Sequence, residues 1–160
     1  MGFPKERYQS LKVLNPVDSI SAKDLAGAAG SSLGIFVIPA GLGAVRIKAI
    51  GMAMAAAGGA QTTAGTAKLQ IAGADVVDAT STAFTVASVA SHAAWTVVET
   101  ELNQSATTDP KAAPTYPKAT AGQKVELVVG TQGAGVGDQT ARFYLLVSQD
   151  YGSESSALNN

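Results

Sequence analysis

Cysteine is absent from the chain, and histidine occurs once among its 160 residues. The absence of cysteine excludes a disulfide framework and a thiolate metal site. His92 alone cannot form a transition-metal site unless carboxylates come from elsewhere, and its segment has no Gly-x-Ser-x-Gly pattern of a nucleophilic serine. We therefore expect no catalytic residue, no metal ligand and no cofactor-binding residue, and we interpret His92 as a surface or loop histidine.

Charged residues are scarce, at 14% of the chain against about 25% in typical soluble domains. The 11 basic and 12 acidic residues are scattered singly, so no basic run is long enough to neutralise several phosphates. This excludes a typical nucleic-acid-binding protein. A surface that is poor in charge and rich in alanine is better tolerated when it is paired with neighbours, so we expect a homotrimer.

Long hydrophobic runs are also missing. The N-terminus has no apolar segment of the kind found in signal peptides, and the most apolar stretch, residues 50–60, is too short to span a bilayer. These features predict a soluble protein that is made in the cytoplasm without a secretion signal and does not enter a membrane.

The hydrophobic residues that are present, 46% of the chain, are largely alanine and valine, with only 6% aromatics. From residue 32 onward they follow the period of two that is typical of strands, including the alanine-rich residues 52–57. Strands joined by Gly-, Pro- and Thr-rich turns predict an all-β antiparallel sandwich of the jelly-roll type. The residues expected to form its core are Val45, Ile47, Leu69, Ile71, Val125, Leu127, Val129, Phe143, Leu145 and Val147.

Three regions are expected: an extended N-terminal arm over residues 1–30, the sandwich over 31–150, and a C-terminal tail over 151–160. Within the arm, residues 8–14 could pair as a strand and residues 21–29 could form one helical turn. The arm is predicted to make the main partner contact, so removal of residues 1–22 should leave the sandwich folded. Its expected contact residues are apolar or aromatic anchors and one arginine: Phe3, Arg7, Tyr8 and Leu11, with Leu14 and Ile20 as further anchors.

A glycine-rich segment spans residues 130–138. A phosphate-binding glycine loop requires a following helix, whereas a strand follows here, so we interpret the segment as a long β-hairpin connection. Because it carries few large side chains, it could press closely against a neighbouring subunit, with Gly133, Gly135 and Asp138 as contact residues.

Glu99 and Glu101 lie two apart on one predicted strand and project from the same face, roughly 6–7 Å apart. This separation is close to that of glycosidase carboxylates, but no lining of aromatics is apparent, so we interpret the pair as a solvated or subunit-contact face. Trp95, expected on the same face, has three possible roles: a core residue, an interface anchor or a platform for a sugar.

Four stretches within residues 38–147 carry a family resemblance: Ile38-Pro39-Ala40-Gly41, Ala64-Gly65-Thr66-Ala67-Lys68, Tyr116-Pro117-Lys118-Ala119-Thr120-Ala121-Gly122-Gln123 and Gly137-Asp138-Gln139-Thr140-Ala141-Arg142-Phe143-Tyr144-Leu145. Through them the chain resembles the small decoration, or cement, proteins of tailed-bacteriophage capsids, which have jelly-roll folds. The resemblance implies a virion protein that binds the outside of an icosahedral head as a trimer and holds adjacent hexamers of the major capsid protein, with no small-molecule substrate. Two alternatives remain, a carbohydrate-binding module with exposed aromatics in a groove and a host-adhesion fibre or tail protein; an enzyme is least supported.

Overall fold

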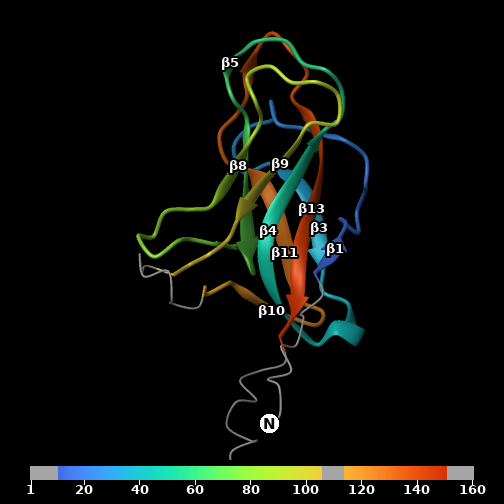
Figure 1. Ribbon diagram of the computed structural model, residues 1–160, viewed down its shortest axis with the longest axis vertical. Helices are drawn as coiled ribbons and strands as arrows, with labels where there is room; N and C mark the ends of the chain where they lie inside the picture. Colours follow the sequence, from blue (N-terminus) through green and yellow to red (C-terminus); the bar gives the residue numbers. More distant parts are fainter. Residues whose placement is uncertain (1–10, 106–113, 151–160) are drawn as a thin grey trace, which may run out of the picture.

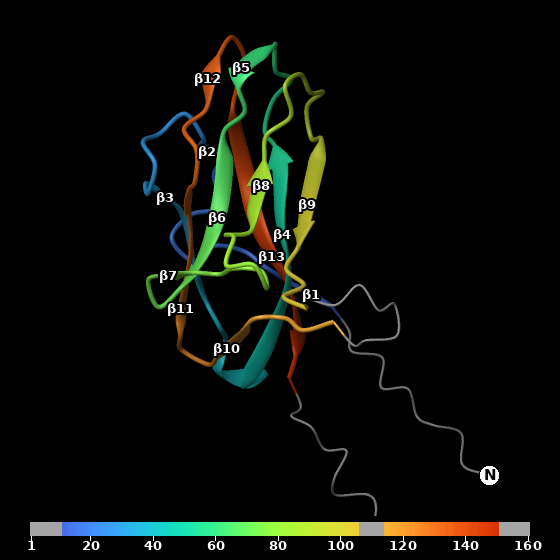
Figure 2. The same cartoon turned by 90° about the vertical axis from the view of Figure 1, so that its left-hand side faces the viewer.

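Alternating apolar side chains give each long strand one buried face, and two sheets bury these faces against each other (Figures 1 and 2). The computed structural model describes residues 11–105 and 114–150. Within these ranges every strand pairing between named strands is antiparallel. The predicted all-β antiparallel sandwich is confirmed, while the jelly-roll connectivity stays a prediction.

The first sheet, sheet A, has β4 and β13 at its centre, paired over nearly their whole length. β1 and β2 both pair with the free edge of β13, and β9 and β10 both pair with the free edge of β4. Among the described residues its strands are β1 (Lys12–Leu14), β2 (Lys23–Asp24), β4 (Ala44–Met54), β9 (Val97–Glu101), β10 (Lys118–Thr120) and β13 (Thr140–Gln149).

The second sheet, sheet B, has the order β3, β11, β6, with β7 and β8 both on the outer edge of β6. Its strands in the described part of the chain are β3 (Ser32–Val37), β6 (Thr66–Ile71), β7 (Ala74–Asp75), β8 (Thr85–Ala87) and β11 (Lys124–Val129). At one end of the sandwich β5 (Gln61–Thr63) pairs with β12 (Ala134–Gly135), and a short 3-10 helix, η1 (Ala40–Leu42), precedes β4.

The predicted core is confirmed. Nine of the ten expected residues are buried, and the tenth, Ile71, is half-buried and packs against the others. Of the alanine-rich residues 52–57, which were predicted to be strand, residues 52–54 continue β4, because β9 and β13 pair with this end of it. The strand ends at Met54, so the prediction is wrong for residues 55–57.

Residues 11–30, expected to belong to a separate arm, form part of the sandwich. Besides the pairing of β1 and β2 with β13, the backbone N–H of Val17 donates to the Ile35 carbonyl (2.7 Å) and that of Gly30 donates to the Val129 carbonyl (2.8 Å). Leu25 is fully buried in the core. The segment therefore joins the edge of sheet A to sheet B, and a boundary at residue 30 does not divide the fold; residues 1–10 and 151–160 lie outside the described part.

Two local expectations are wrong. Residues 21–29 form β2 and turns, with no helical turn, because pairing with β13 satisfies the backbone of Lys23 and Asp24. The glycine-rich segment 130–138 is not a hairpin connection: it leaves β11 in sheet B and enters β13 in sheet A, so it crosses between the sheets.

Candidate binding surfaces

A row of exposed apolar side chains lies along residues 11–20, which we call the edge segment. Each of these side chains is more than half exposed, up to 69% for Ile20. Because β1 has β13 as its only strand partner in the described part of the chain, nothing described covers the outer side of this segment. The side chains of the row are Leu11, Val13, Val17 and Ile20.

The outer face of sheet A carries a second surface, which we call the β4 groove. Its floor consists of small residues of β4: Ala49, Gly51 and Ala53. Larger residues pair with them on both flanking strands, so the floor is recessed between two walls. The wall from β9 is formed by Val97, Glu99 and Glu101, and the wall from β13 is formed by Arg142, Tyr144 and Leu146.

Tyr144 crosses the groove at its centre. A Cβ added to Gly51 would lie 2.0 Å from the Tyr144 ring carbon Cζ, so the ring lies directly over the glycine. This position allows the Tyr144 hydroxyl to donate to the Glu99 carboxylate on the opposite wall. Burial of the phenol, together with the adjacent Glu99 charge, raises the Tyr144 pKa above its usual value.

A second tyrosine–glutamate pair lies further along the groove. The buried Tyr116 donates its hydroxyl to Glu101, and the Nζ atom of Lys48 lies 3.7 Å from the Tyr116 ring centroid. Burial and then the Glu101 carboxylate raise the pKa of Tyr116 to about 12. Burial lowers the pKa of Lys48, and the nearby Arg46 acts in the same direction.

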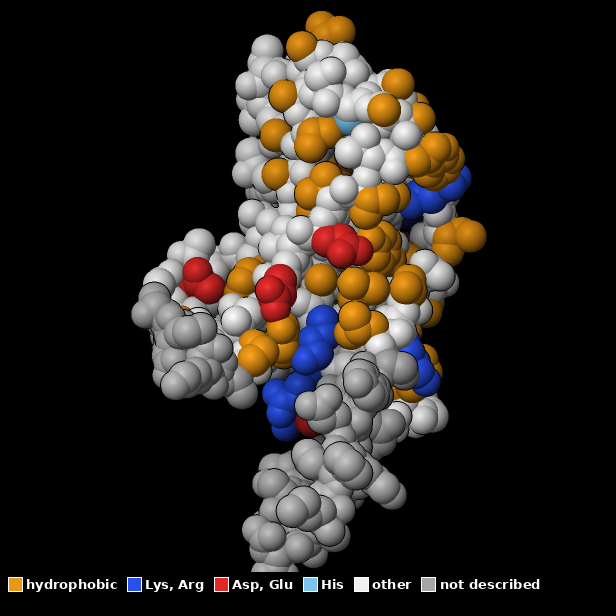
Figure 3. Space-filling view, viewed as in Figure 1, with side chains coloured by type: hydrophobic (Ala, Val, Ile, Leu, Met, Phe, Trp, Pro, Cys, Tyr) orange, Lys and Arg blue, Asp and Glu red, His pale blue; other side chains and the backbone are white. Residues whose placement is uncertain are grey.

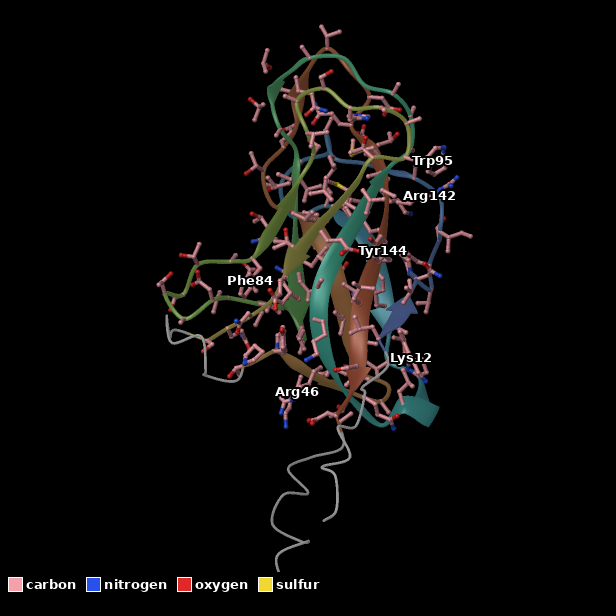
Figure 4. All side chains as sticks on the ribbon, in the orientation of Figure 1. Lys12, Arg46, Phe84, Trp95, Arg142 and Tyr144 are labelled. Atoms are coloured by element: carbon pink, nitrogen blue, oxygen red, sulfur yellow. The ribbon has the colours of Figure 1, made fainter. Side chains whose placement is uncertain are left out.

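Trp95 lies at the other end of the groove, beside Arg142, as the labelled side chains in Figure 4 show. The tryptophan is 55% exposed, and the guanidinium Cζ of Arg142 is 4.9 Å from its ring centroid. Of the three roles considered from the sequence, the core role is wrong. Trp95 does not continue the strand face of Glu99, because it precedes β9 and has a left-handed φ of 67°.

In space-filling view the acidic side chains lie near the middle of this face, with basic side chains below them and an apolar cluster at the upper right (Figure 3). The sequence placed Arg142 and Tyr144 on an outward face, and placed Glu99 with Glu101. Nothing in the sequence indicated that these residues would meet Lys48 and Tyr116. Only the register of the folded sheet brings such distant positions together: Ala49 of β4 pairs with Glu101 of β9, 52 residues away, and with Leu146 of β13, 97 residues away.

The loops at the far end of the sandwich are held by internal contacts. His92, expected at the surface or in a loop, is buried in a loop, where its Nε2 atom lies 2.9 Å from the Asp138 carbonyl oxygen. The Thr140 hydroxyl, and after it the Thr140 backbone N–H (2.8 Å), donate to the Asp138 carboxylate and lower the Asp138 pKa. Gly133 is buried against the side chain of Gln139.

The predicted contact residues therefore fall into three groups: exposed residues, residues held in the loops, and residues outside the described part of the chain. Leu11 and Trp95 are exposed and belong to the two surfaces described above. Gly133 is buried and cannot contact a partner directly, Gly135 is exposed but lies against the backbone of Thr62, and Asp138 is half-buried in the loop contacts. The remaining predicted contact residues, Phe3, Arg7 and Tyr8, lie outside the described residues.

Within residues 11–105 and 114–150, no group of three or more His, Asp or Glu side chains could hold a metal ion. No helix in the same ranges is long and apolar enough to cross a membrane. Comparison of the chain with models of protein families, with curated proteins and with solved structures gives no match.

Proposed function

We propose that the chain is a non-catalytic structural protein of a virion, a decoration or cement protein with jelly-roll connectivity. It binds the outer capsid surface as a homotrimer and stabilises contacts between major capsid protein subunits. The observation that carries the proposal is the exposed apolar row of the edge segment, on a chain with few charged residues.

The edge segment suits a protein partner. Covering an apolar side chain contributes about 1.5–3 kcal/mol when it is fully buried, and the four side chains of the row lie within ten consecutive residues. The row also lies beside the anchors Phe3 and Tyr8 in sequence, so one continuous stretch of chain could supply the contact. Repeated copies on a symmetric capsid would convert a modest contact into firm attachment.

The test is decoration of capsids that lack this protein, measured by electron microscopy and co-sedimentation. The double substitution Val17→Asp and Ile20→Asp places two charges in the row and should weaken binding by about tenfold or more. The control is Val136→Asp, because Val136 is 80% exposed but lies in the crossing loop 130–138. Equal decoration by both variants would assign the contact to another surface, and absence of the chain from the parent particle would refute the virion assignment.

A further inference from the structure

Trp95 occupies a backbone position that disfavours it. It is the third residue of a turn in which the Thr96 N–H donates to the Ala93 carbonyl (3.2 Å), and its φ of 67° is typical of glycine. Left-handed backbone is an outlier for a bulky residue, and such strain clusters at functional sites. The strain is maintained by two backbone hydrogen bonds, each 2.9 Å long: the Trp95 N–H donates to the Met54 carbonyl, and the Met54 N–H donates to the Thr96 carbonyl. Its effect is to present the ring at the end of the β4 groove.

The groove combines apolar surface with hydrogen-bonding groups on both sides of Tyr144. On one side is a hollow of about 450 Å³ lined by Leu11, Ala49 and Leu146 together with Lys48, Glu99, Glu101 and Tyr116. On the other side is a hollow of about 490 Å³ whose lining includes Asn15, Ser19, Ser21 and Arg142. Both volumes fall within the range of about 300–1,000 Å³ that is common for ligand clefts.

The charges of the groove balance. Lys48 and Arg142 supply two cations, and Glu99 and Glu101 supply two carboxylates. Two cations beside two carboxylates are a poor match for a polyanion. The same four groups, with the serine hydroxyls of the second hollow, can donate to and accept from the hydroxyl groups of an uncharged ligand.

The lining side chains already hold one another. Tyr144 is bonded to Glu99 and Tyr116 to Glu101, while Arg142 lies over Trp95. A ligand that binds here would therefore order few side chains, which reduces the entropic cost of binding. Flat aromatic surface, paired carboxylates and hydroxyls along an open groove suit a chain of pyranose rings, whose C–H faces pack on aromatic rings while their hydroxyls bond to polar groups.

We propose that the β4 groove binds a neutral oligosaccharide, with Trp95 as the stacking platform and Glu99, Glu101 and Arg142 as hydrogen-bonding groups. The groove shares Leu11 and Ile20 with the apolar row, whereas Val17 belongs to the row alone and Trp95 lies outside the row, so the two proposals can be tested separately. A capsid-bound copy in which β4 faces outward would present the site to glycans around the particle.

Trp95 is the single tryptophan of the chain, so its fluorescence reports on this site alone. We would titrate the full chain with neutral cello-, malto-, xylo-, manno- and chito-oligosaccharides. At least one should give a saturable change in tryptophan emission. By calorimetry, Trp95→Ala and Glu99→Gln should each weaken that binding by about tenfold or more, Trp95→Phe should retain part of it, and Val136→Ala should leave it unchanged.

Two results would overturn the proposal: no saturable change with any of these sugars up to about 10 mM, or binding by Trp95→Ala as tight as by the unaltered chain. Tighter binding of an acidic oligosaccharide such as heparin would refute the neutral ligand class. A thermal melt of each variant identifies those that fail to fold, and Trp95→Phe then takes the place of Trp95→Ala. Val17 lines neither hollow, so the single substitution Val17→Asp should weaken decoration and still bind sugar, while Trp95→Ala should still decorate capsids. Failure of one proposal is therefore distinguishable from failure of the other.

Discussion

At the scale of single residues, Gly51 shows how a missing side chain shapes the surface. Glycine weakens a strand interior because it has no side chain to pack, yet here it lies at the centre of β4. The space that a Cβ would fill is occupied by the Tyr144 ring, which reaches across the strand to Glu99. The glycine therefore permits the contact that joins the two walls of the β4 groove.

Replacing Gly51 with alanine should displace the Tyr144 ring and lower the free energy of unfolding by about 1–3 kcal/mol, the usual cost of overpacking. Urea denaturation measures this change. Gly41→Ala is the matched control, because an added Cβ there meets nothing within 4 Å, and it should alter stability by less than about 0.5 kcal/mol. In the Tyr144→Ala background the cost of Gly51→Ala should shrink; equal costs in both backgrounds would contradict the packing argument.

Tyr116 gives a prediction for alkaline pH. Its pKa is about 12 in the folded chain against 10.0 for an ordinary tyrosine, so the unfolded chain releases this proton first. The resulting stability is complete below pH 10 and is lost as the pH rises from 10 toward 12. Tyr116→Phe removes this contribution, so its urea midpoint should fall less steeply than that of the unaltered chain across that interval.

Tyr144 is present in both proteins of that comparison, so its own titration cancels. The absorbance of tyrosinate provides an independent measurement, in which Tyr116→Phe should remove a component with a midpoint near 12. Parallel stability curves for the two proteins, with a Tyr116 midpoint near 10.0, would show that neither the burial of Tyr116 nor its contact with Glu101 is maintained in solution.

At the scale of elements, the segment before β3 is more than an attachment device. Pro16 is buried where it packs over Gly34, at 3.1 Å from the position of an added Cβ. The Asp18 carboxylate accepts from the Ile35 backbone N–H (3.0 Å), and the Val17 N–H donates back to the Ile35 carbonyl. These contacts, together with β1, stabilise the edges of both sheets.

Removal of residues 1–22 should therefore destabilise the sandwich, contrary to the expectation from the sequence. The loss of β1 pairing and of the hydrogen bonds to Ile35 should cost about 2–4 kcal/mol at 0.5–1.5 kcal/mol for each bond, visible as a lower melting temperature. Removal of residues 1–10 leaves β1 in place and serves as the control. A melt of the longer truncation identical to that of the control would show that the edge contacts contribute nothing.

At the scale of the whole molecule, the low charge content and the exposed apolar row both favour association. Multi-angle light scattering at micromolar concentration should give three times the chain mass of 16.0 kDa. A chain mass of 16.0 kDa at every concentration, with single copies rather than trimers on the particle, would contradict the homotrimer.

The core was predictable because burial in a sheet is a local, periodic property. Alternation alone predicts which side chains of a strand face the core, as for Val45 and Ile47 on β4 and for Leu145 and Val147 on β13. All four are fully buried. The strand nature of residues 52–54 followed in the same way from the continuing pattern of β4. These features depend on neighbours in sequence, so the sequence was sufficient to predict them.

The surfaces were decided by contacts between distant parts of the chain. Trp95 does not lie on the predicted face, because a turn and two backbone hydrogen bonds with Met54 impose a left-handed backbone. Gly133 is buried because the crossing loop packs against Gln139. The sequence by itself determined which side chains face the core, since alternation requires only the strand. The tertiary structure alone decided which outward side chains meet, because the register between β4, β9 and β13 places Gly51 between Glu99 and Tyr144.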